Sequence, residues 1–474
     1  MSSPPEPPGR PEEPARDARD ARDTRAPRDA REPVLALLER HGWNATSFQI
    51  MERGFRYWFD GVDACVGYVD TGRAWVAAGP PIAPAERLAE TSARFVEAAR
   101  AAGRRVCLFG TEERFREAAG WRALRIGEQP LWSPADWDDV LRGRRSLREQ
   151  LRRARAKGVT VRMLPPEELA PSHATRQALE GLIARWLAAR TIAPMGFLVQ
   201  VDPFTFPERR RLFVAEVAGR VVGFLGVIPI YARSGWFFED FLRDPDAPNG
   251  TIELLVDAGM RAAAAERVSV VTLGLAPLAG DVGPWLRSAR RLGRALYDFE
   301  GLRAFKAKLE PQRWSPIFLS YPAGGSAARA VIDTLTAFAR GGLLRFGLRT
   351  MLRGPAIVIR LLAALLVVWT AVLALPWSAP YFPSPAWQYG WVAFDVALCG
   401  ALFALARRWR QPLADLVAGA VTADAALTLG EALVYNAPRA RGVADLCVIA
   451  AACVAPAFAA VLLWNARVHR APRD

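Results

Sequence analysis

The chain has 474 residues, of which 51% are apolar, and its formal net charge is +14. This length accommodates two to four units of ordinary domain size. The five cysteines form no CxxC pair and no even framework, so we expect them to be reduced and expect no metal site. Only three histidines are present, which disfavours catalysis that depends on a central histidine.

Residues 1–32 are rich in proline, arginine and aspartate and contain almost no large apolar side chain. Such a segment cannot bury enough surface to offset its chain entropy, so we predict that it is disordered. It also lacks the apolar core of a secretory signal peptide. We therefore expect the part that follows to begin, and to stay, in the cytoplasm.

Residues 33–165 alternate between strand and helix patterns. The run FRYWFDGVDACVGYVDTGRAWVAAG is typical of antiparallel strands with a turn near residues 70–72. An amphipathic helix that ends at Gly103 follows, and then the buried strand RVCLFG, a short helix and a strand in WRALRIGEQPLW. This first unit ends with a basic helix over residues 142–157, where the arginines are so dense that we expect them all round the helix.

Residues 166–325 repeat that order. A helix over EGLIARWLAAR precedes a hairpin that turns at residues 218–220, the strand GWFFEDFLR, a helix in NGTIELLVDAGMRAAAAE and the buried strand VSVVTLGL. The repeated order predicts a duplicated α/β unit, matching the N-acetyltransferase-like (GNAT) fold used twice. Acyl-CoA users of that fold carry R/Q-x-x-G-x-G/A where this chain has DAPNGTIELL, so we expect no CoA cofactor.

The last part of the chain contains four apolar stretches. A basic amphipathic linker over residues 326–353 precedes them. The stretches run roughly over residues 355–375, 387–406, 412–435 and 443–464. Each approaches the ~20 residues that cross ~30 Å of hydrocarbon. We therefore expect a bundle of about four transmembrane helices over residues 354–466, followed by a tail over residues 467–474.

The distribution of arginines predicts how this bundle is oriented. Arginines cluster before the first stretch and after the second, whereas the loop between these two stretches carries no charge. Four spans then leave both termini and the α/β region in the cytoplasm, at the cell inner membrane. Arg439 and Arg441, between the last two stretches, are the one discordant pair.

Several motifs in a fixed order resemble one known family. The runs FEDFLRDPDAPNGTIELLVDAGM, VTLGLAPLAGD and ALYDFEGLRAFKAKLEPQRWSPIFLSYP are similar to the C-terminal synthase domain of phosphatidylglycerol lysyltransferases, the multiple peptide resistance factor family. The stretches GRAWVAAGPPIAP and SLREQLRRARAKGV also look like that domain, so the resemblance covers roughly residues 45–322. Members of this family often carry a large flippase domain before the synthase, whereas here a small bundle follows it.

The resemblance implies a double GNAT fold with a defined activity. The family moves an aminoacyl group from a charged tRNA to the hydroxyl of a membrane lipid, commonly phosphatidylglycerol, and is associated with resistance to antimicrobial peptides. The implied partners are aminoacyl-tRNA, an anionic membrane phospholipid and the membrane itself, and no cofactor is implied. The sequence gives no indication of the oligomeric state.

The resemblance marks Asp240 and Arg243 as catalytic, because they stand in the place of the family's D-L-M-R motif. We expect Asp240 to be a base or a ligand of the amino group, and Arg243 to be a phosphate or oxyanion clamp. Residues three apart on a regular strand face opposite sides, so a bulge or a strand end is needed to bring them together. A structural ion pair is the alternative.

Substrate-binding residues are expected at the start of the next helix and in the basic motif GLRAFKAKL. Asn249 and Glu253 lie at the helix start, where Glu253 can bind the α-ammonium of the substrate or interact with the helix dipole. Arg303, Lys306 and Lys308 can hold the tRNA 3′ end or the lipid phosphate. The alternative for these three is an ordinary solvated helix face.

The basic helix is expected to bind phosphate. The candidates are Arg144, Arg145, Arg148, Arg152 and Arg153. The phosphate can belong to the tRNA backbone or to anionic lipid headgroups, and a merely solvated helix is the alternative.

Three function hypotheses follow from the sequence. The first is an aminoacyl-tRNA-dependent lipid aminoacyltransferase. The second is an acyltransferase of the same fold that uses acyl-CoA or a peptidoglycan precursor. The third is a non-catalytic, membrane-tethered protein that binds lipid or RNA.

Overall fold

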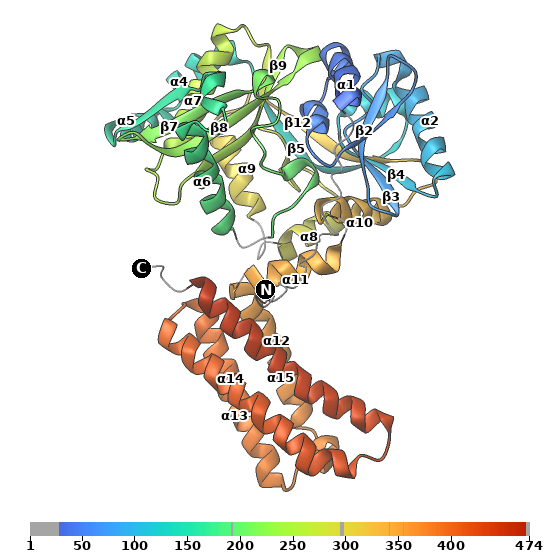
Figure 1. The fold of residues 1–474 in the computed structure, drawn as a ribbon, viewed down its shortest axis with the longest axis vertical. Helices are drawn as coiled ribbons and strands as arrows, with labels where there is room; N and C mark the ends of the chain where they lie inside the picture. The colour runs from blue at the N-terminus through green and yellow to red at the C-terminus, as the bar shows by residue number, and fades with distance from the viewer. Residues whose placement is uncertain (1–27, 191–192, 294–297, 341, 354, 471–474) are drawn as a thin grey trace, which may run out of the picture.

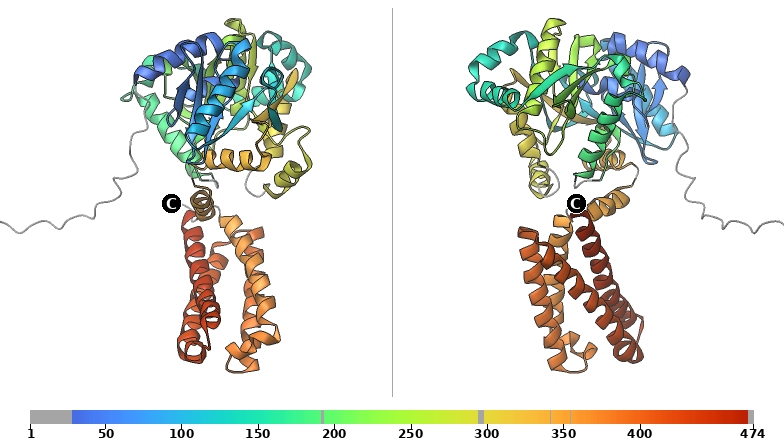
Figure 2. Two further views of the ribbon diagram at one scale, coloured as in Figure 1. Left: turned by 90° about the vertical axis from the view of Figure 1, so that its right-hand side faces the viewer. Right: turned by 60° about the vertical axis from the view of Figure 1, so that its left-hand side comes forward.

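The computed structural model of the protein describes residues 28–190, 193–293, 298–340, 342–353 and 355–470. Within these ranges the chain forms an α/β body followed by a C-terminal helical bundle, which projects from one end of the body (Figure 1). Figure 2 shows the same separation from two further sides. The two parts are therefore distinct in space as well as in sequence.

The first helix, α1 (Arg28–His41), begins inside the segment that we expected to be disordered. The rest of that segment, residues 1–27, lies outside the described residues. Val34, Leu37 and Leu38 of α1 are buried in the core of the α/β body. Their spacing is that of one helix face, so helical structure starts earlier than the composition of the segment suggested.

One mixed sheet runs through the α/β body, in the order β1-β2-β3-β4-β12-β5-β10-β9-β8-β7-β6, and β11 pairs with β5. The strands are β1 (Arg56–Phe59), β2 (Cys65–Asp70), β3 (Ala74–Ala78), β4 (Arg105–Thr111), β5 (Arg122–Trp132), β6 (Val159–Met163), β7 (Arg211–Val217), β8 (Arg220–Ile230), β9 (Gly235–Arg243), β10 (Val270–Thr272), β11 (Ala276–Pro277) and β12 (Arg313–Tyr321).

The helices of the α/β body after α1 are α2 (Leu88–Ala101), α3 (Glu113–Ala119), α4 (Trp137–Gly143), α5 (Arg145–Ala156), α6 (Ala174–Ala188), α7 (Thr251–Ala265), α8 (Pro284–Gly293), α9 (Phe299–Lys308), α10 (Ala327–Phe338) and α11 (Leu343–Arg353). In each half, antiparallel strands lead into a helix and a parallel strand, as β3–α2–β4 and as β9–α7–β10. This repeated order confirms the predicted tandem GNAT-like α/β fold.

The two halves exchange strands across the expected boundary at residue 165. β6 precedes that boundary but pairs with β7 of the second half. β12 is the last strand of the chain, yet it lies between β4 and β5 of the first half. A strand can join a sheet at any unpaired backbone edge, whichever half of the sequence it comes from. Sequence order alone therefore did not predict the position of β6 or of β12.

The turn between β7 and β8 falls where the sequence predicts it. Ala218 and Gly219 have φ angles of 49° and 77°, and two consecutive positive φ angles are typical of a two-residue hairpin turn. β9 and α7 also occupy the segments predicted for them.

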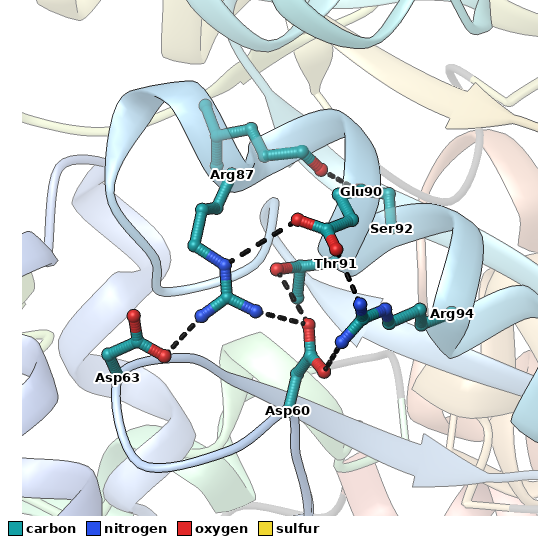
Figure 3. Close-up of polar contacts among 8 residues, drawn as sticks. Asp60, Asp63, Arg87, Glu90, Thr91, Ser92 and Arg94 are labelled. Atoms are coloured by element: carbon teal, nitrogen blue, oxygen red, sulfur yellow. Dashed lines mark hydrogen bonds and ion pairs between the residues drawn. The ribbon is translucent and has the colours of Figure 1, made fainter.

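A charged network anchors the start of α2 to the loop between β1 and β2 (Figure 3). The buried carboxylate of Asp60 accepts hydrogen bonds from Arg87 at 2.9 Å, Thr91 at 3.1 Å and Arg94 at 3.0 Å. Arg87 also contacts Asp63. Both oxygens of the buried Asp60 thus have cationic partners, as a buried carboxylate requires.

The second half has helices on both faces of its sheet. α7 covers one face, where Leu255 and Met260 pack with Phe238 of β9. α6 covers the opposite face, where Leu179 packs with Phe224 of β8. Side chains along β9 therefore point alternately toward α7 and toward the α6 face.

The expected linker over residues 326–353 is partly built into the α/β body. The ring of Phe338 on α10 lies 5.2 Å from the ring of Phe109 on β4. Arg105 also pairs with the buried Asp333, with Nη2 and Oδ1 2.6 Å apart. Thus α10 packs against the first half, and α11 connects the α/β body to the bundle.

The bundle consists of α12 (Pro355–Leu373), α13 (Pro385–Arg407), α14 (Gln411–Glu431) and α15 (Val443–Arg470). Among the described residues, three helical stretches are long and apolar enough to cross a membrane: Pro385–Arg407, Gln411–Arg439 and Val443–Arg467. The first of the four predicted stretches forms an apolar helix over Ile359–Leu373, which is shorter than these three.

The outer surface of the bundle is apolar. Ile359, Leu402 and Val417 are buried between the helices, while Leu427 and Val454 are well exposed on the outside. Apolar side chains on both the inside and the outside are typical of helices that are surrounded by lipid. The composition and packing of the bundle therefore suit a membrane.

Candidate active site

Asp240 lies on β9 directly after a β-bulge. Phe238 and Asp240 pair with consecutive residues of β8, so Glu239 is the extra residue of the bulge. Phe238 and Phe241 both pack on the α7 side. The two residues between them therefore share the opposite face, and the bulge aims the Glu239 and Asp240 carboxylates the same way.

The bulge does not bring Asp240 and Arg243 together. Pairing with β8 is regular from Asp240 to Arg243, so these two residues face opposite sides of the sheet. The expected convergence is wrong because the bulge falls before Asp240 and not between the two residues. Arg243 instead donates to the carbonyl of Ala247 at 3.1 Å and to Oδ1 of Asn249 at 3.4 Å, which orders the loop before α7.

The environment of Asp240 is unusual for a carboxylate. Its side chain has no hydrogen bond or ion pair within the described part of the chain. Burial raises the pKa of Asp240 well above its ordinary value, the neighbouring Glu239 raises it further, and Arg210 opposes the shift. A carboxylate with a raised pKa is a stronger proton acceptor near neutral pH.

Glu253 and Lys308 form an ion pair between the first turn of α7 and the end of α9. Arg303 of α9 donates to Glu128 of β5 at 2.9 Å, and its guanidinium lies 4.9 Å from the centre of the Trp314 ring. The predicted substrate-binding residues Glu253, Arg303 and Lys308 thus have partners within the protein.

Lys306 is buried, with 2% of its surface exposed. Its ammonium donates to the carbonyls of Leu273 at 2.7 Å, Gly274 at 2.9 Å and Leu275 at 2.9 Å. Burial lowers the pKa of Lys306 to about 7, although the three carbonyl acceptors satisfy every N–H of the protonated form. Lys306 is therefore a buried clamp on the loop after β10, and the solvated-face alternative does not hold for it.

The predicted basic helix is two helices, α4 and α5, separated at Arg144. Its arginines do not lie all round α5, because Leu147, Leu151 and Ala154 form a buried stripe. Arg155 pairs with the buried Asp257 at 2.8 Å. The apolar residues of this stripe are spaced by three and four residues in the sequence. The high density of arginines around them obscured that pattern.

The candidate phosphate-binding arginines have different surroundings. Arg144 pairs with Glu310, and Arg148 donates to the Leu141 carbonyl at 2.5 Å. Arg152 and Arg153 share Glu149, at 2.6 Å and 3.4 Å. All of the predicted arginines are exposed: Arg144, Arg145, Arg148, Arg152 and Arg153. A single acid shared by two arginines leaves net positive charge at the surface.

Sequence reasoning missed the charged residues near Asp240. Arg210 pairs with Glu52, with Nη2 and Oε1 3.1 Å apart, and also with Glu239. Gln49 donates from Nε2 to Glu239 Oε1 at 2.7 Å. Glu52 comes from the first half and Arg210 from the second, so no local pattern in the sequence could have indicated this cluster.

These features define a tandem GNAT-like α/β protein that carries a bundle suited to a membrane. Residues 35–321, more than half of the chain, match the family model described as phosphatidylglycerol lysyltransferase, C-terminal. The chain therefore belongs to this family.

Two curated relatives illustrate the match. Phosphatidylglycerol lysyltransferase from Bacillus subtilis (strain 168) is 30% identical over 162 residues, which are 32% of this chain and 18% of that protein. The lysylphosphatidylglycerol biosynthesis bifunctional protein LysX from Nocardia farcinica is 28% identical over 246 residues, which are 48% of this chain and 21% of that protein. The match spans only about a fifth of the length of each relative.

Two solved structures share the fold. A C-terminal domain (DUF2156) from Agrobacterium fabrum has a TM-score of 0.56 and 24% identity, and covers 66% of this chain and 98% of that chain. L-PGS from Bacillus licheniformis has a TM-score of 0.56 and 21% identity, and covers 65% of this chain and 96% of that chain. At these identities the likeness establishes the fold of the α/β body.

Proposed function

We propose that the protein is a membrane-bound aminoacyltransferase, which moves an aminoacyl group from aminoacyl-tRNA to the hydroxyl of a membrane lipid such as phosphatidylglycerol. The observation that carries the proposal is Asp240, a carboxyl with a raised pKa and no partner among the described residues, in a chain of the phosphatidylglycerol lysyltransferase family. The two relatives described above are a phosphatidylglycerol lysyltransferase and a lysylphosphatidylglycerol biosynthesis protein, both of which are named for the same lipid.

The reaction needs little covalent help from the protein. The aminoacyl ester is already activated, so the lipid hydroxyl attacks its carbonyl carbon while Asp240 takes the hydroxyl proton. The bond to the tRNA 3′ oxygen then breaks, and that oxygen leaves with the proton that Asp240 took up. Positioning of the two substrates and stabilisation of the oxyanion supply most of the rate.

Arg243, Asn249 and Glu253 have a supporting role in this proposal. Arg243 holds the loop before α7 through Ala247 and Asn249, and Glu253 begins the helix that this loop enters. These residues position the N-terminus of α7, whose free backbone N–H groups suit a lipid phosphate. Lys308 holds α9 beside this helix, while Arg303 ties α9 to β5 and Lys306 ties it to the loop after β10.

We propose an inner-membrane topology with both termini in the cytoplasm, where charged tRNA is found. The units of this arrangement are residues 33–165 and 166–325 for the two GNAT-like halves, and 354–466 for the bundle. α5 lies on the flank of the α/β body, while α8, α10 and α11 lie nearer the bundle (Figures 1 and 2). This position favours tRNA over lipid as the partner of α5.

Lipid extraction and mass spectrometry test the proposal. Membranes that contain the protein are supplied with aminoacyl-tRNA, without ATP, metal or CoA, and we expect a new aminoacyl lipid. Ribonuclease treatment before the reaction should abolish the product. Product that survives complete digestion, or that forms only with acyl-CoA, would contradict the tRNA donor, and an unchanged lipidome would favour a non-catalytic protein.

A further inference from the structure

The helices α10 and α11 connect the part of the chain that matches the family model to the bundle. The match ends at residue 321, whereas α10 spans Ala327–Phe338 and α11 spans Leu343–Arg353. Both helices lie at the end of the α/β body that is nearer the bundle (Figures 1 and 2). The family match thus assigns no role to α10 or α11, and their own side chains indicate what they contact.

One side of α10 packs on the α/β body, and the other side is exposed. Ala330 and Asp333 are buried, whereas the apolar side chains of Ile332 and Leu335 are 52% and 50% exposed. Arg329, one turn before Ile332, is exposed as well. Residues three apart are neighbours on a helix surface. The three exposed side chains therefore form one stripe, the α10 stripe, which points away from the sheet.

α11 combines exposed apolar and basic side chains. Its buried Thr350 accepts a hydrogen bond from the backbone N–H of Ala193 at 3.3 Å, which fixes α11 to the α/β body. Leu344 is 89% exposed, and Arg345 and Arg349, which lie one turn apart, are exposed too. A free helix surface with both kinds of side chain is typical of helices that lie in a membrane interface.

The bundle indicates where the headgroup layer of a membrane would lie. α12 and α14 begin, and α13 and α15 end, at the end of the bundle nearer the α/β body (Figures 1 and 2). This end carries Arg407 of α13, Arg410 directly before α14, and Arg467 of α15, which pairs with Asp415 of α14 at 2.5 Å. Arginines at the ends of apolar helices lie at the level of the headgroups. α11 lies against α12 and α15, so it lies at that level.

The charge of this connection favours an anionic partner. Residues 326–353 contain one acid, Asp333, which pairs with Arg105. The basic residues of the same segment are Arg329, Arg340, Arg345, Arg349 and Arg353. A second copy of the chain would bring the same positive charge to the contact and be repelled. Anionic phospholipid headgroups carry the opposite charge and attract basic segments next to a membrane helix.

We propose that α10 and α11 form a docking surface for the anionic headgroup layer of the membrane. Leu344 enters the boundary between headgroups and acyl chains, while Arg345 and Arg349 bind lipid phosphates. The α10 stripe rests on the same layer. Docking holds the α/β body in one orientation on the membrane, in addition to the covalent link through α12. This inference rests on the placement of the bundle in a membrane and is independent of the reaction.

Hydrogen–deuterium exchange of the full-length protein in lipid nanodiscs tests this surface. Amides of α11 should exchange at least about 10-fold more slowly in nanodiscs that contain phosphatidylglycerol than in phosphatidylcholine nanodiscs. Raising the salt from about 0.1 M to about 1 M shortens the Debye length from about 10 Å to about 3 Å, so the difference should disappear. Amides of α13 and α15 should be protected in every nanodisc.

The alternatives give different results. Equal exchange of α11 in the two lipids would overturn the proposal. Exchange that is just as slow in detergent micelles would show that a second copy or the α/β body covers α11, and would overturn it as well. Fast exchange of α13 and α15 in nanodiscs would contradict the membrane placement of the bundle, and with it the docking surface.

The two arginines of α11 have a charge-matched control. Arg345→Gln with Arg349→Gln should bring the exchange of α11 in anionic nanodiscs to the level seen in phosphatidylcholine. Arg40→Gln with Arg100→Gln removes the same charge from exposed positions on α1 and α2 and should leave the exchange of α11 unchanged. Slow exchange that persists in the first double variant would contradict the proposal.

Leu344 tests the apolar part of the surface separately. Leu344→Glu places a negative charge against the headgroups and should speed the exchange of α11 in anionic nanodiscs at least about 10-fold. Because Leu344 is exposed, this change does not disturb the packed core. Val62→Glu is the control, since Val62 is 92% exposed and lies between β1 and β2. Unchanged exchange in a Leu344→Glu protein that melts like the wild type would count against docking.

Discussion

Glu253 at the start of α7 and Lys308 at the end of α9 form an ion pair, with Oε1 and Nζ 2.9 Å apart. Glu253 is buried, whereas Lys308 is more than a third exposed. The carboxylate that the sequence suggested as a ligand of the substrate ammonium thus already has a cation from the protein. Its role in the structure is to hold α9 against α7.

The ion pair predicts a particular pattern of stability. Lys308→Met leaves the Glu253 carboxylate buried without its partner, so we expect a loss of about 1–3 kcal/mol in the free energy of unfolding. The double variant Glu253→Gln with Lys308→Met should recover most of that loss. Denaturant unfolding of Lys308→Met, Glu253→Gln and the double variant measures the coupling, and additive effects of the two changes would argue against it.

Asp240 and Arg243 should both affect turnover, for different reasons. Asp240→Asn removes the proposed base, and Arg243→Ala releases the loop before α7, so each should lower turnover at least ~10²-fold. Expression and melting temperature should stay close to those of the wild type. Initial rates of lipid product formation test this, and near wild-type rates in either variant would return that residue to a structural role.

Arg210 should control how stability depends on pH. Glu52 and Asp240 have pKa values raised by burial, so the fold retains protons that the unfolded chain loses. Stability from these groups is full below their ordinary pKa values and falls as pH rises through the raised ones. Arg210→Met removes the opposing charge and should steepen that fall.

We therefore expect Arg210→Met to melt well below the wild type at about pH 8 and to recover part of the difference at about pH 5. The loss at the higher pH should be about 3–5 kcal/mol, the scale for breaking a buried ion pair. Thermal melts at the two pH values provide the measurement. A difference that is the same at both would show that the carboxyls do not titrate as described.

The exposed arginines of α5 should contribute to tRNA binding. Replacing Arg152 and Arg153 with alanine should weaken binding similarly for all tRNA sequences and reduce the salt slope by about 1 per residue. Arg100→Ala, at an exposed arginine near the end of α2, is the control. Filter binding across a salt series gives the slopes, and reduced affinity for anionic vesicles with unaltered tRNA binding would assign α5 to the membrane.

Polar side chains in α14 lead to a prediction about the bundle. Asp424 accepts from Thr428, and Glu431 accepts from the indole of Trp391, each at 3.2 Å. Carboxylates within a membrane often mark function, although they can also hold helices together. If this stripe lines a polar cleft, the double variant Asp424→Asn with Glu431→Gln inserts normally and yields less lipid product.

Quantitative blotting of membranes accompanies that measurement. Unaltered product at a normal protein level would rule out a functional cleft. Loss of the protein from the membrane would instead favour the structural alternative.

Local patterns in the sequence predicted those parts of the fold that depend on neighbouring residues. The hairpin turn at Ala218 and Gly219 and the helix α7 were predictable because glycine, chain periodicity and helix-start signals act over a few residues. The bulge at Glu239 was not, since one extra residue in a strand shows only in the pairing with β8. The face of the sheet on which Arg243 lies follows from that register.

The candidate site was predictable only in part, for a similar reason. Asp240 was found through its motif, but its neighbours Glu52 and Arg210 are 158 residues apart in sequence. Lys306 is a second case, because the sequence left substrate binding and a solvated helix face both open, and the loop carbonyls that surround it are known only from the fold. In both cases the surroundings of the side chain depend on packing between residues that are far apart in the sequence.

The position of β12 has a consequence for biosynthesis. The ribosome completes the first half long before it makes this strand, so β4 and β5 wait with open edges that another chain can pair with. The α/β body can close only once Tyr321 has emerged, and α12 begins soon afterwards at Pro355. Closure of the body and delivery of the first apolar helix to the membrane are thus almost simultaneous, and a nascent chain that stalls before residue 313 is left with a split sheet prone to aggregation.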